Sequence, residues 1–312
     1  MTLPLLLVGH GTRDADGVAQ FHDFVDLVQR RAPHLDVAGG FIELADPPIT
    51  DAVSSLTGRG HRELIAVPLV LVAAGHSKGD VPAALVREQV RHPGLSFRYG
   101  RPLGVHPALL AVVDDRLAAV VPADLRATTA VVLVGRGAYD PDANADIAKV
   151  ARLLWEGRRW PIVEPAYISL TTPSVQDAME RCRRLGATRI AVVPYFLFAG
   201  VLPDRVGTQA LEYAAAHPEL DVVVAAAIGG DDRVAELALE RYAEAVGGDI
   251  RMNCDACIYR VAMPGYESRL GAPQTPHDHP ADPSVPGGAA PAHGHATGHG
   301  HGHAHHDHAT RR

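Results

Sequence analysis

Short apolar runs alternate with amphipathic stretches through about the first hundred residues of the chain. The amphipathic stretches have the spacing of helices, and the apolar runs have the length and composition of strands. The predicted strands are Leu3–Val8, Val37–Glu43, Glu63–Val72 and Leu95–Tyr99. Because residues 65–72 are apolar at every position, the third strand should be buried on both faces. The pattern therefore predicts a parallel sheet with helices on both sides.

A local signal marks the start of the second predicted helix. Asp46 can accept hydrogen bonds from the free amides of a helix start, and proline suits the first helical position. The helix is therefore expected to begin at Pro47 with Asp46 as its cap.

The same order of elements returns between Ala130 and about Gly248. The two parts of the chain align with a shift of 126 residues, which places LLLVGHG at 5–11 on VVLVGRG at 131–137. We therefore predict an α/β fold of two tandem Rossmann-like βαβα repeats with parallel sheets. The predicted domains are the two repeats at 1–122 and 123–250, a short segment at 251–270, and a disordered His-rich tail at 271–312.

Three polar side chains of the first repeat are absent from the second, although the glycine and apolar positions around them agree. They are His10, Glu43 and His76, and each lies at or just beyond the carboxyl end of a predicted strand. The residues aligned with them are Arg136, Ser169 and Val201. Open α/β sheets bind their ligands at that edge. The comparison of the repeats therefore predicts one site, carried by the N-terminal repeat.

The predicted site combines two imidazoles with one carboxylate. Gly9 and Gly11 let the backbone turn sharply around His10 and present it at the sheet edge. Neutral imidazoles and a carboxylate suit a borderline transition metal. Imidazole also accepts protons near neutral pH, because its ordinary pKa is about 6.5. The residues thus favour chemistry in which a metal ion is held and protons are removed.

Other classes of site lack their motifs in this chain. The loop 9–14 has Asp14 where a dinucleotide fingerprint needs a glycine, and no GxxxxGK[ST] phosphate loop occurs, so no nucleotide is expected. A histidine phosphatase would want an arginine directly before His10, where this chain has glycine, and no GxSxG elbow of a serine hydrolase is present.

Composition narrows the partners and the compartment. The formal net charge of −7 argues against a nucleic-acid partner. The longest apolar run, 64–75, is about half the roughly 20 residues that cross a bilayer, so no membrane segment is expected. The three cysteines, Cys182, Cys254 and Cys257, are too few for a disulfide framework, which predicts a cytoplasmic protein.

At this point nearly the whole chain resembles the long-form sirohydrochlorin chelatases, two-repeat members of the ATP-independent chelatases. In that family the histidines after the first and third strands are the catalytic and metal-binding pair, which implies these roles for His10 and His76. Glu43 matches an acidic residue beside the family's site. The resemblance implies a chelatase-like fold and insertion of Co²⁺ or Fe²⁺ into sirohydrochlorin, for cobalamin or sirohaem synthesis, without a nucleotide.

The substrate implied by this resemblance carries many carboxylates, whereas the protein is acidic. Binding therefore requires a cleft that is locally positive. Arg13, Lys78 and Arg136 lie beside the histidines in the sequence alignment and are the candidates to bind the carboxylates. Their alternative role is that of solvated charges on the rim.

A CxxC pair follows the second repeat. The segment around Cys254 and Cys257 reads MNCDAC and resembles the iron–sulfur segment of long-form cobaltochelatases. A [4Fe–4S] cluster usually takes four thiolates, so a cluster here would need a homodimer in which each chain supplies two, or ligands other than cysteine. Without a cluster the two residues are reduced thiols.

The tail from Gly271 is rich in histidine, with ten of the 18 histidines between His277 and His308. Such a segment cannot form a core, but it would bind divalent metal ions and store them or deliver them to the site. The alternative is a solvated tail with incidental affinity for metal. The tail and the MxCxxC resemblance favour cobalt. Iron insertion for sirohaem, nickel insertion into the same ring, and a non-catalytic metal storage or delivery protein are the alternatives.

Overall fold

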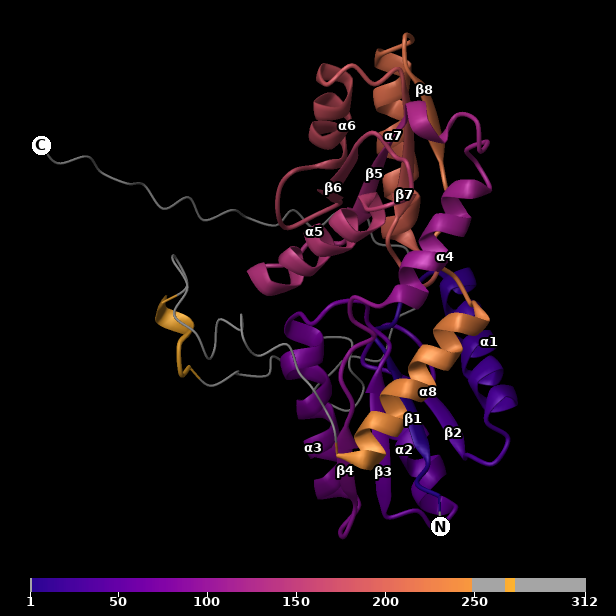
Figure 1. Cartoon of the computed structure of the whole chain (residues 1–312). Helices are drawn as coiled ribbons and strands as arrows, with labels where there is room; N and C mark the ends of the chain where they lie inside the picture. The colour runs from indigo at the N-terminus through magenta and orange to yellow at the C-terminus, as the bar shows by residue number, and fades with distance from the viewer. Residues whose placement is uncertain (1, 249–266, 273–312) are drawn as a thin grey trace, which may run out of the picture.

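The computed structural model describes residues 2–248 and 267–272 and contains two four-stranded parallel sheets (Figure 1). The N-terminal sheet has the order β2-β1-β3-β4, and the C-terminal sheet repeats it as β6-β5-β7-β8. The first four strands are β1 (Leu5–Gly9), β2 (Val37–Phe41), β3 (Glu63–Pro68) and β4 (Ser96–Tyr99). The other four are β5 (Thr129–Gly135), β6 (Val163–Tyr167), β7 (Arg189–Pro194) and β8 (Asp221–Val224). The predicted fold class is confirmed.

The two sheets also share their register. Leu5 lies opposite Val37 and Ile65, and Val131, which is 126 residues further along, lies opposite Val163 and Ala191. The alignment of the two repeats therefore holds at the level of individual strand partners.

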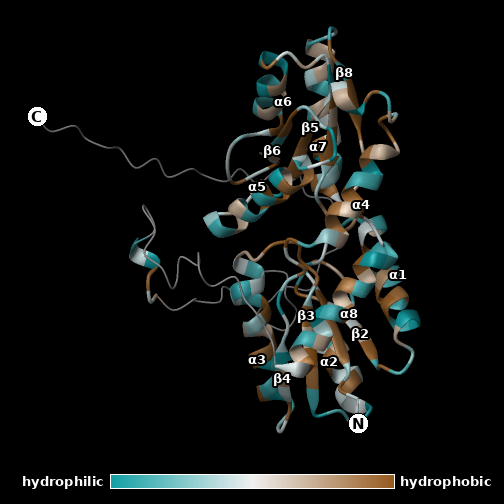
Figure 2. Ribbon diagram, in the orientation of Figure 1, coloured by the Kyte–Doolittle hydropathy of each residue, from teal (hydrophilic) through white to brown (hydrophobic). Residues whose placement is uncertain are grey.

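Helices cover both faces of each sheet, as the continuous apolar strands predict. In the N-terminal half, Leu6 and Val8 pack toward α2 and α3, whereas Leu5 and Leu7 pack toward α1. Burying such side chains contributes roughly 1.5–3 kcal/mol each. These helices are α1 (Ala15–Arg31), α2 (Ile49–Gly58) and α3 (Val81–Arg91), the last preceded by a π-helical turn, η1 (His76–Asp80). Figure 2 shows the strands largely brown and the surrounding helices partly teal.

The helices of the C-terminal half occupy equivalent places. Here α6 and α7 pack on one face of the sheet, and α5 packs on the other. They are α5 (Pro141–Trp155), α6 (Val175–Arg184) and α7 (Val201–Ala216). Two short 3₁₀ helices lie outside this pattern, η2 (Arg126–Thr128) and η3 (Glu267–Arg269). Among the described helices, none combines the length and apolar character needed to cross a bilayer.

The last helix of each repeat crosses to the other half. Helix α4 (Pro107–Ala118) packs against α5 and β7, and α8 (Asp232–Gly247) packs against α1, β3 and β4. The two crossing helices also contact each other. The predicted boundaries at 1–122 and 123–250 divide the chain by its repeat, whereas the packing joins the halves through both exchanged helices.

Two local expectations were wrong. Helix α2 begins at Ile49 with Pro48 as its cap and without a side-chain cap, because Pro47 is not yet helical and its carbonyl oxygen accepts from the Phe41 amide at 2.9 Å. The third strand ends at Pro68 rather than at Val72, and residues 69–72 leave the sheet. They are apolar because they line a cleft.

Candidate active site between the two halves

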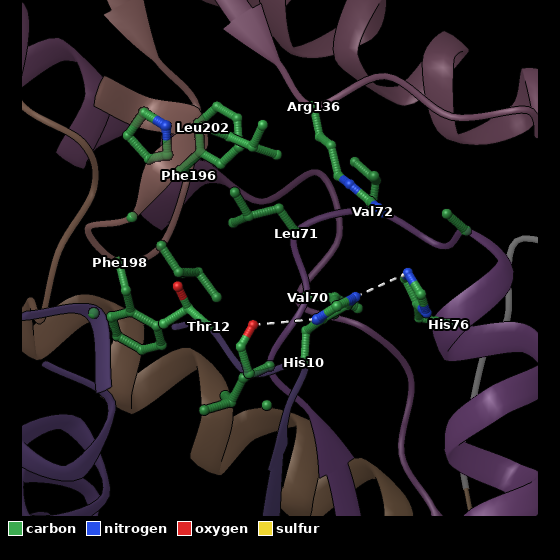
Figure 3. Close-up of a pocket in the computed structure, with 18 of the residues that line it drawn as sticks. His10, Thr12, Val70, Leu71, Val72, His76, Arg136, Phe196, Phe198 and Leu202 are labelled. Carbon is green, nitrogen blue, oxygen red and sulfur yellow. Dashed lines mark hydrogen bonds between the residues drawn. The ribbon is translucent and has the colours of Figure 1, made fainter. Parts of the chain in front are cut away.

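Two histidines meet at the carboxyl ends of β1 and β3. His10 follows β1 directly, and His76 opens the π-helical turn η1 after the loop that leaves β3. Their Nε2 atoms are 3.0 Å apart, with the rings nearly perpendicular at 88° (Figure 3). The Oε1 atom of Glu43, beyond the end of β2, is 3.6 Å from His10 Nε2. The structure thus brings together the three side chains that distinguish the first repeat from the second.

The remaining ring nitrogens hold the histidines in this orientation. His76 Nδ1 lies 2.7 Å from the carboxylate of Asp80, whose side chain is only 4% exposed, and His10 Nδ1 lies 3.2 Å from the carbonyl oxygen of Gly11. A carbonyl and a carboxylate both accept hydrogen bonds, so both Nδ1 atoms donate. Each neutral ring then turns the lone pair of its Nε2 toward the other.

Two lone pairs that face each other at 3.0 Å repel unless a positive charge lies between them. A proton or a metal ion meets this requirement. A metal ion about 2.1 Å from both nitrogens would be held at an angle of roughly 90°, which leaves its other positions open. Among the described residues, no group of three or more His, Cys, Asp and Glu side chains is arranged to hold a metal ion. The two Nε2 atoms are placed to hold such an ion, with the Glu43 carboxylate beside them.

The backbone next to His10 approaches the backbone of Glu43 so closely that it needs glycine at position 11. Gly11 has a φ of +104°, and a Cβ at this position would collide with the carbonyl oxygen of Glu43. The Glu43 amide donates to the His10 carbonyl at 3.1 Å, which fixes the two functional residues relative to each other. The second half repeats the same contact with Gly137 and Ser169. The scaffold is therefore duplicated, and only its side chains differ.

The histidine pair lies in a cleft of about 640 Å³ that is lined by both halves. Its walls are mainly apolar, with residues 69–72 from the N-terminal half and residues 195–202 from the C-terminal half (Figure 3). Pockets of this size accept a small organic ligand, and apolar walls suit the faces of a flat one.

The three residues predicted to bind carboxylates do not share one environment in the structure. Arg13 and Arg136 line the cleft and are exposed to it. The pKa of Arg136 lies below its usual value, because desolvation by the surrounding protein outweighs the opposing effect of the Glu43 carboxylate. Lys78 differs from the prediction, because its side chain is 6% exposed and its ammonium donates to Asp140 and Asp142 instead of facing the cleft. We therefore leave Lys78 out of substrate binding.

Sequence reasoning missed two parts of the site. Asp80 was not recognised, although its spacing of four residues from His76 in a helical segment was a usable signal. The apolar wall formed by Phe196, Phe198 and Leu202 was also missed, because these side chains share a cleft with the histidines only when the two halves are packed together (Figure 3).

The predictions for the C-terminal segment concern residues that the structure does not describe. Cys254, Cys257 and the His-rich residues lie outside the described residues. Cys182 is buried in the second half, and burial raises the pKa of its thiol to about 12. The comparisons below do not support an iron–sulfur cluster, so neither the cluster nor the homodimer that would share it enters the proposal.

Fold and site together define a class of protein: a duplicated α/β protein that places one imidazole pair in a cleft between its halves. The CbiX family model matches residues 4–120 and 130–245, and the chain belongs to this family. One of the two matches falls in each repeat of the chain.

The named relatives agree with this assignment. Sirohydrochlorin cobaltochelatase of Priestia megaterium is 34% identical over 83% of this chain and 85% of its own length. Sirohydrochlorin ferrochelatase of Bacillus subtilis is 28% identical over 78% of this chain and 92% of its own length. Two solved structures of SirB from B. subtilis, one with Fe3+ and one with cobalt, are similar with TM-scores of 0.69 and 0.66. They are 28% and 26% identical, and each match covers 80% of this chain and 97% of SirB.

Proposed function

We propose that this protein is a sirohydrochlorin chelatase that inserts Co²⁺ into the ring without ATP. The observation that carries the proposal is the pair of Nε2 atoms 3.0 Å apart inside a cleft that both halves line. His10 and His76 hold the incoming ion, and Glu43 assists. The cytoplasm, expected from the sequence, is the proposed location.

The residues divide the reaction into two tasks. The macrocycle lies between the apolar walls, where its face can approach the ion held by the histidines. As the metal bonds to the ring nitrogens, two pyrrole N–H bonds break and two protons leave. The imidazoles released by the metal and the nearby Glu43 carboxylate are placed to accept them.

Cobalt is preferred over iron in this proposal. The relative at 34% identity is a cobaltochelatase, whereas the ferrochelatase of B. subtilis is 28% identical. The MxCxxC segment and the His-rich tail also resemble cobaltochelatases.

The test of the proposal is an absorbance assay with sirohydrochlorin under anaerobic conditions, run with Co²⁺, Fe²⁺ and Ni²⁺ in turn and without nucleotide. We expect the spectrum of the metallated ring to appear with the protein far faster than without it, and fastest with Co²⁺. Rates no higher than those without protein would reject chelatase activity. Faster turnover with Fe²⁺ would reject the preference for cobalt but not the chelatase activity.

Metal binding should release a proton from the site. We infer that the facing Nε2 atoms, which are 3.0 Å apart, share a proton in the metal-free protein, and that a metal ion displaces it. At pH about 7.5, where free imidazoles are mostly neutral, we expect wild type to release about one proton more per site than the His76→Ala variant. The measurement is a Co²⁺ titration in buffers of different ionisation enthalpy. The His-rich tail is the same in both proteins and cancels, and equal proton release would contradict the shared proton.

The two arginines of the cleft should act on substrate binding. Arg13→Ala and Arg136→Ala should each raise the KM for sirohydrochlorin about 5- to 10-fold, because each removes one charge that faces the substrate carboxylates. The kcat should change little. Arg59→Ala is the matched control, since Arg59 follows α2 at the far end of the sheet. Wild-type KM values in both cleft variants would remove these residues from substrate binding.

A further inference from the structure

The turn that carries His76 is also tied to the opposite half of the protein. Lys78 lies two residues after His76 in η1, and its Nζ atom is 2.5 Å from Asp140 and 3.1 Å from Asp142. Both carboxylates lie at the start of α5, where Asp140 is the helix cap. The three side chains are 6%, 9% and 2% exposed. We call them the Lys78 bridge.

The Lys78 bridge lies away from the exchanged helix α4. The exchanged helix α4 lies on the right of Figure 1, whereas α3, which continues from η1, and α5 lie on the left. In this view the bridge therefore joins the halves on the side opposite to α4.

The equivalent contact at the other edge of the cleft uses different chemistry. Asp14 and Asp16 are the counterparts of Asp140 and Asp142, but the residue aligned with Lys78 is Pro203. At that edge Gly17 lies against the carbonyl of Ala199, and the Ala199 amide donates to the Gln20 side chain at 2.8 Å. At the edge where His76 lies, by contrast, the contact is ionic.

Stability alone is a poor explanation for this bridge. Burying three charged groups has a desolvation cost that often equals or exceeds their mutual attraction. The two contacts of Lys78 Nζ, at 2.5 Å from Asp140 and 3.1 Å from Asp142, define where η1 lies relative to α5.

We propose that Lys78, Asp140 and Asp142 are positioning residues, which hold the turn η1 so that His76 Nε2 faces His10 Nε2 in the assembled cleft. They touch neither the metal ion nor the macrocycle. Their effect passes through the five-residue turn, in which a displacement of Lys78 also displaces His76. The role in the reaction rests on the proposed function.

The test is a full-length triple variant, Lys78→Met, Asp140→Asn and Asp142→Asn, which keeps the side-chain sizes and removes the charges together. Asparagine retains the helix cap at position 140. We expect the thermal midpoint to stay near that of wild type, the kcat to fall about 10- to 100-fold, and the KM for sirohydrochlorin to stay within about twofold. Asp115→Asn is the matched control, since it removes an exposed ion pair between α4 and α8, and it should leave kcat unchanged.

A second measurement does not depend on activity. Crystal structures of wild type and the triple variant should show the two Nε2 atoms further apart in the variant by about 1 Å or more. Should the triple variant not fold, Asp142→Asn alone serves for both measurements, with an expected fall in kcat of about threefold. An unchanged Nε2 separation together with wild-type kcat would overturn the inference. An inactive wild type would instead reject the proposed function, while the separation would still test the bridge.

Discussion

His76→Ala should lower the kcat of metal insertion by about 10²- to 10⁴-fold while the protein remains folded. The variant removes one of two metal ligands and one proton acceptor, and a positioned proton acceptor alone contributes a factor of this size. His10→Ala should have a similar effect. Because the two rings act as a unit, the double variant should be little worse than either single one. The measurement is the absorbance assay at saturating sirohydrochlorin and metal.

The control for this prediction is His34→Ala, since His34 is an exposed histidine in the loop between α1 and β2. It should have wild-type activity. A kcat within about threefold of wild type for either His10→Ala or His76→Ala would show that the pair does not carry the reaction.

Gly11→Ala should destabilise the protein by about 2–3 kcal/mol and also abolish activity. A methyl group at this φ of +104° meets the Glu43 carbonyl, so the backbone that joins His10 to Glu43 must move. The measurements are the free energy of unfolding in urea and the rate of metal insertion.

The second half offers a matched control for this substitution. Gly137→Ala creates the same collision with the Ser169 carbonyl and should cost a similar free energy of unfolding. It adjoins Arg136 rather than His10, so at a temperature where both variants are folded its KM for sirohydrochlorin should rise, whereas its kcat should stay far above that of Gly11→Ala. Equal losses of activity would mean that the turn matters only for stability.

The fold was predictable because the chain contains the same pattern of strands and helices twice. The alternation of apolar strands and helices, repeated after 126 residues, implies the same sheet in both halves, and Leu5 and Val131 indeed have equivalent partners. The site was predictable for the opposite reason. His10, Glu43 and His76 stand out because the duplicated scaffold does not need them, and the structure places them together.

The remaining features depend on packing that local sequence does not encode. The exchange of α4 and α8 changes no strand or helix pattern, so the repeat alone could not reveal it. Lys78 appeared suited to bind carboxylates, but those it meets belong to α5 of the other half rather than to a substrate.

The apolar run at 65–72 was ambiguous in a similar way. A strand buried on both faces and a cleft lined with aliphatic side chains both require apolar residues, and this run supplies one and then the other. Periodicity could therefore find the run but not the point at which Pro68 ends the strand.

The most direct test of the central claim is anomalous diffraction at the cobalt edge from crystals of the wild-type protein soaked in Co²⁺. Diffraction locates each ion, so metal bound by the His-rich tail is distinguished from metal in the cleft. We expect a cobalt ion about 2.1 Å from the Nε2 atoms of both His10 and His76, on the side that opens to the apolar walls. Cobalt found only elsewhere, with the two imidazoles unchanged at full occupancy, would contradict the account.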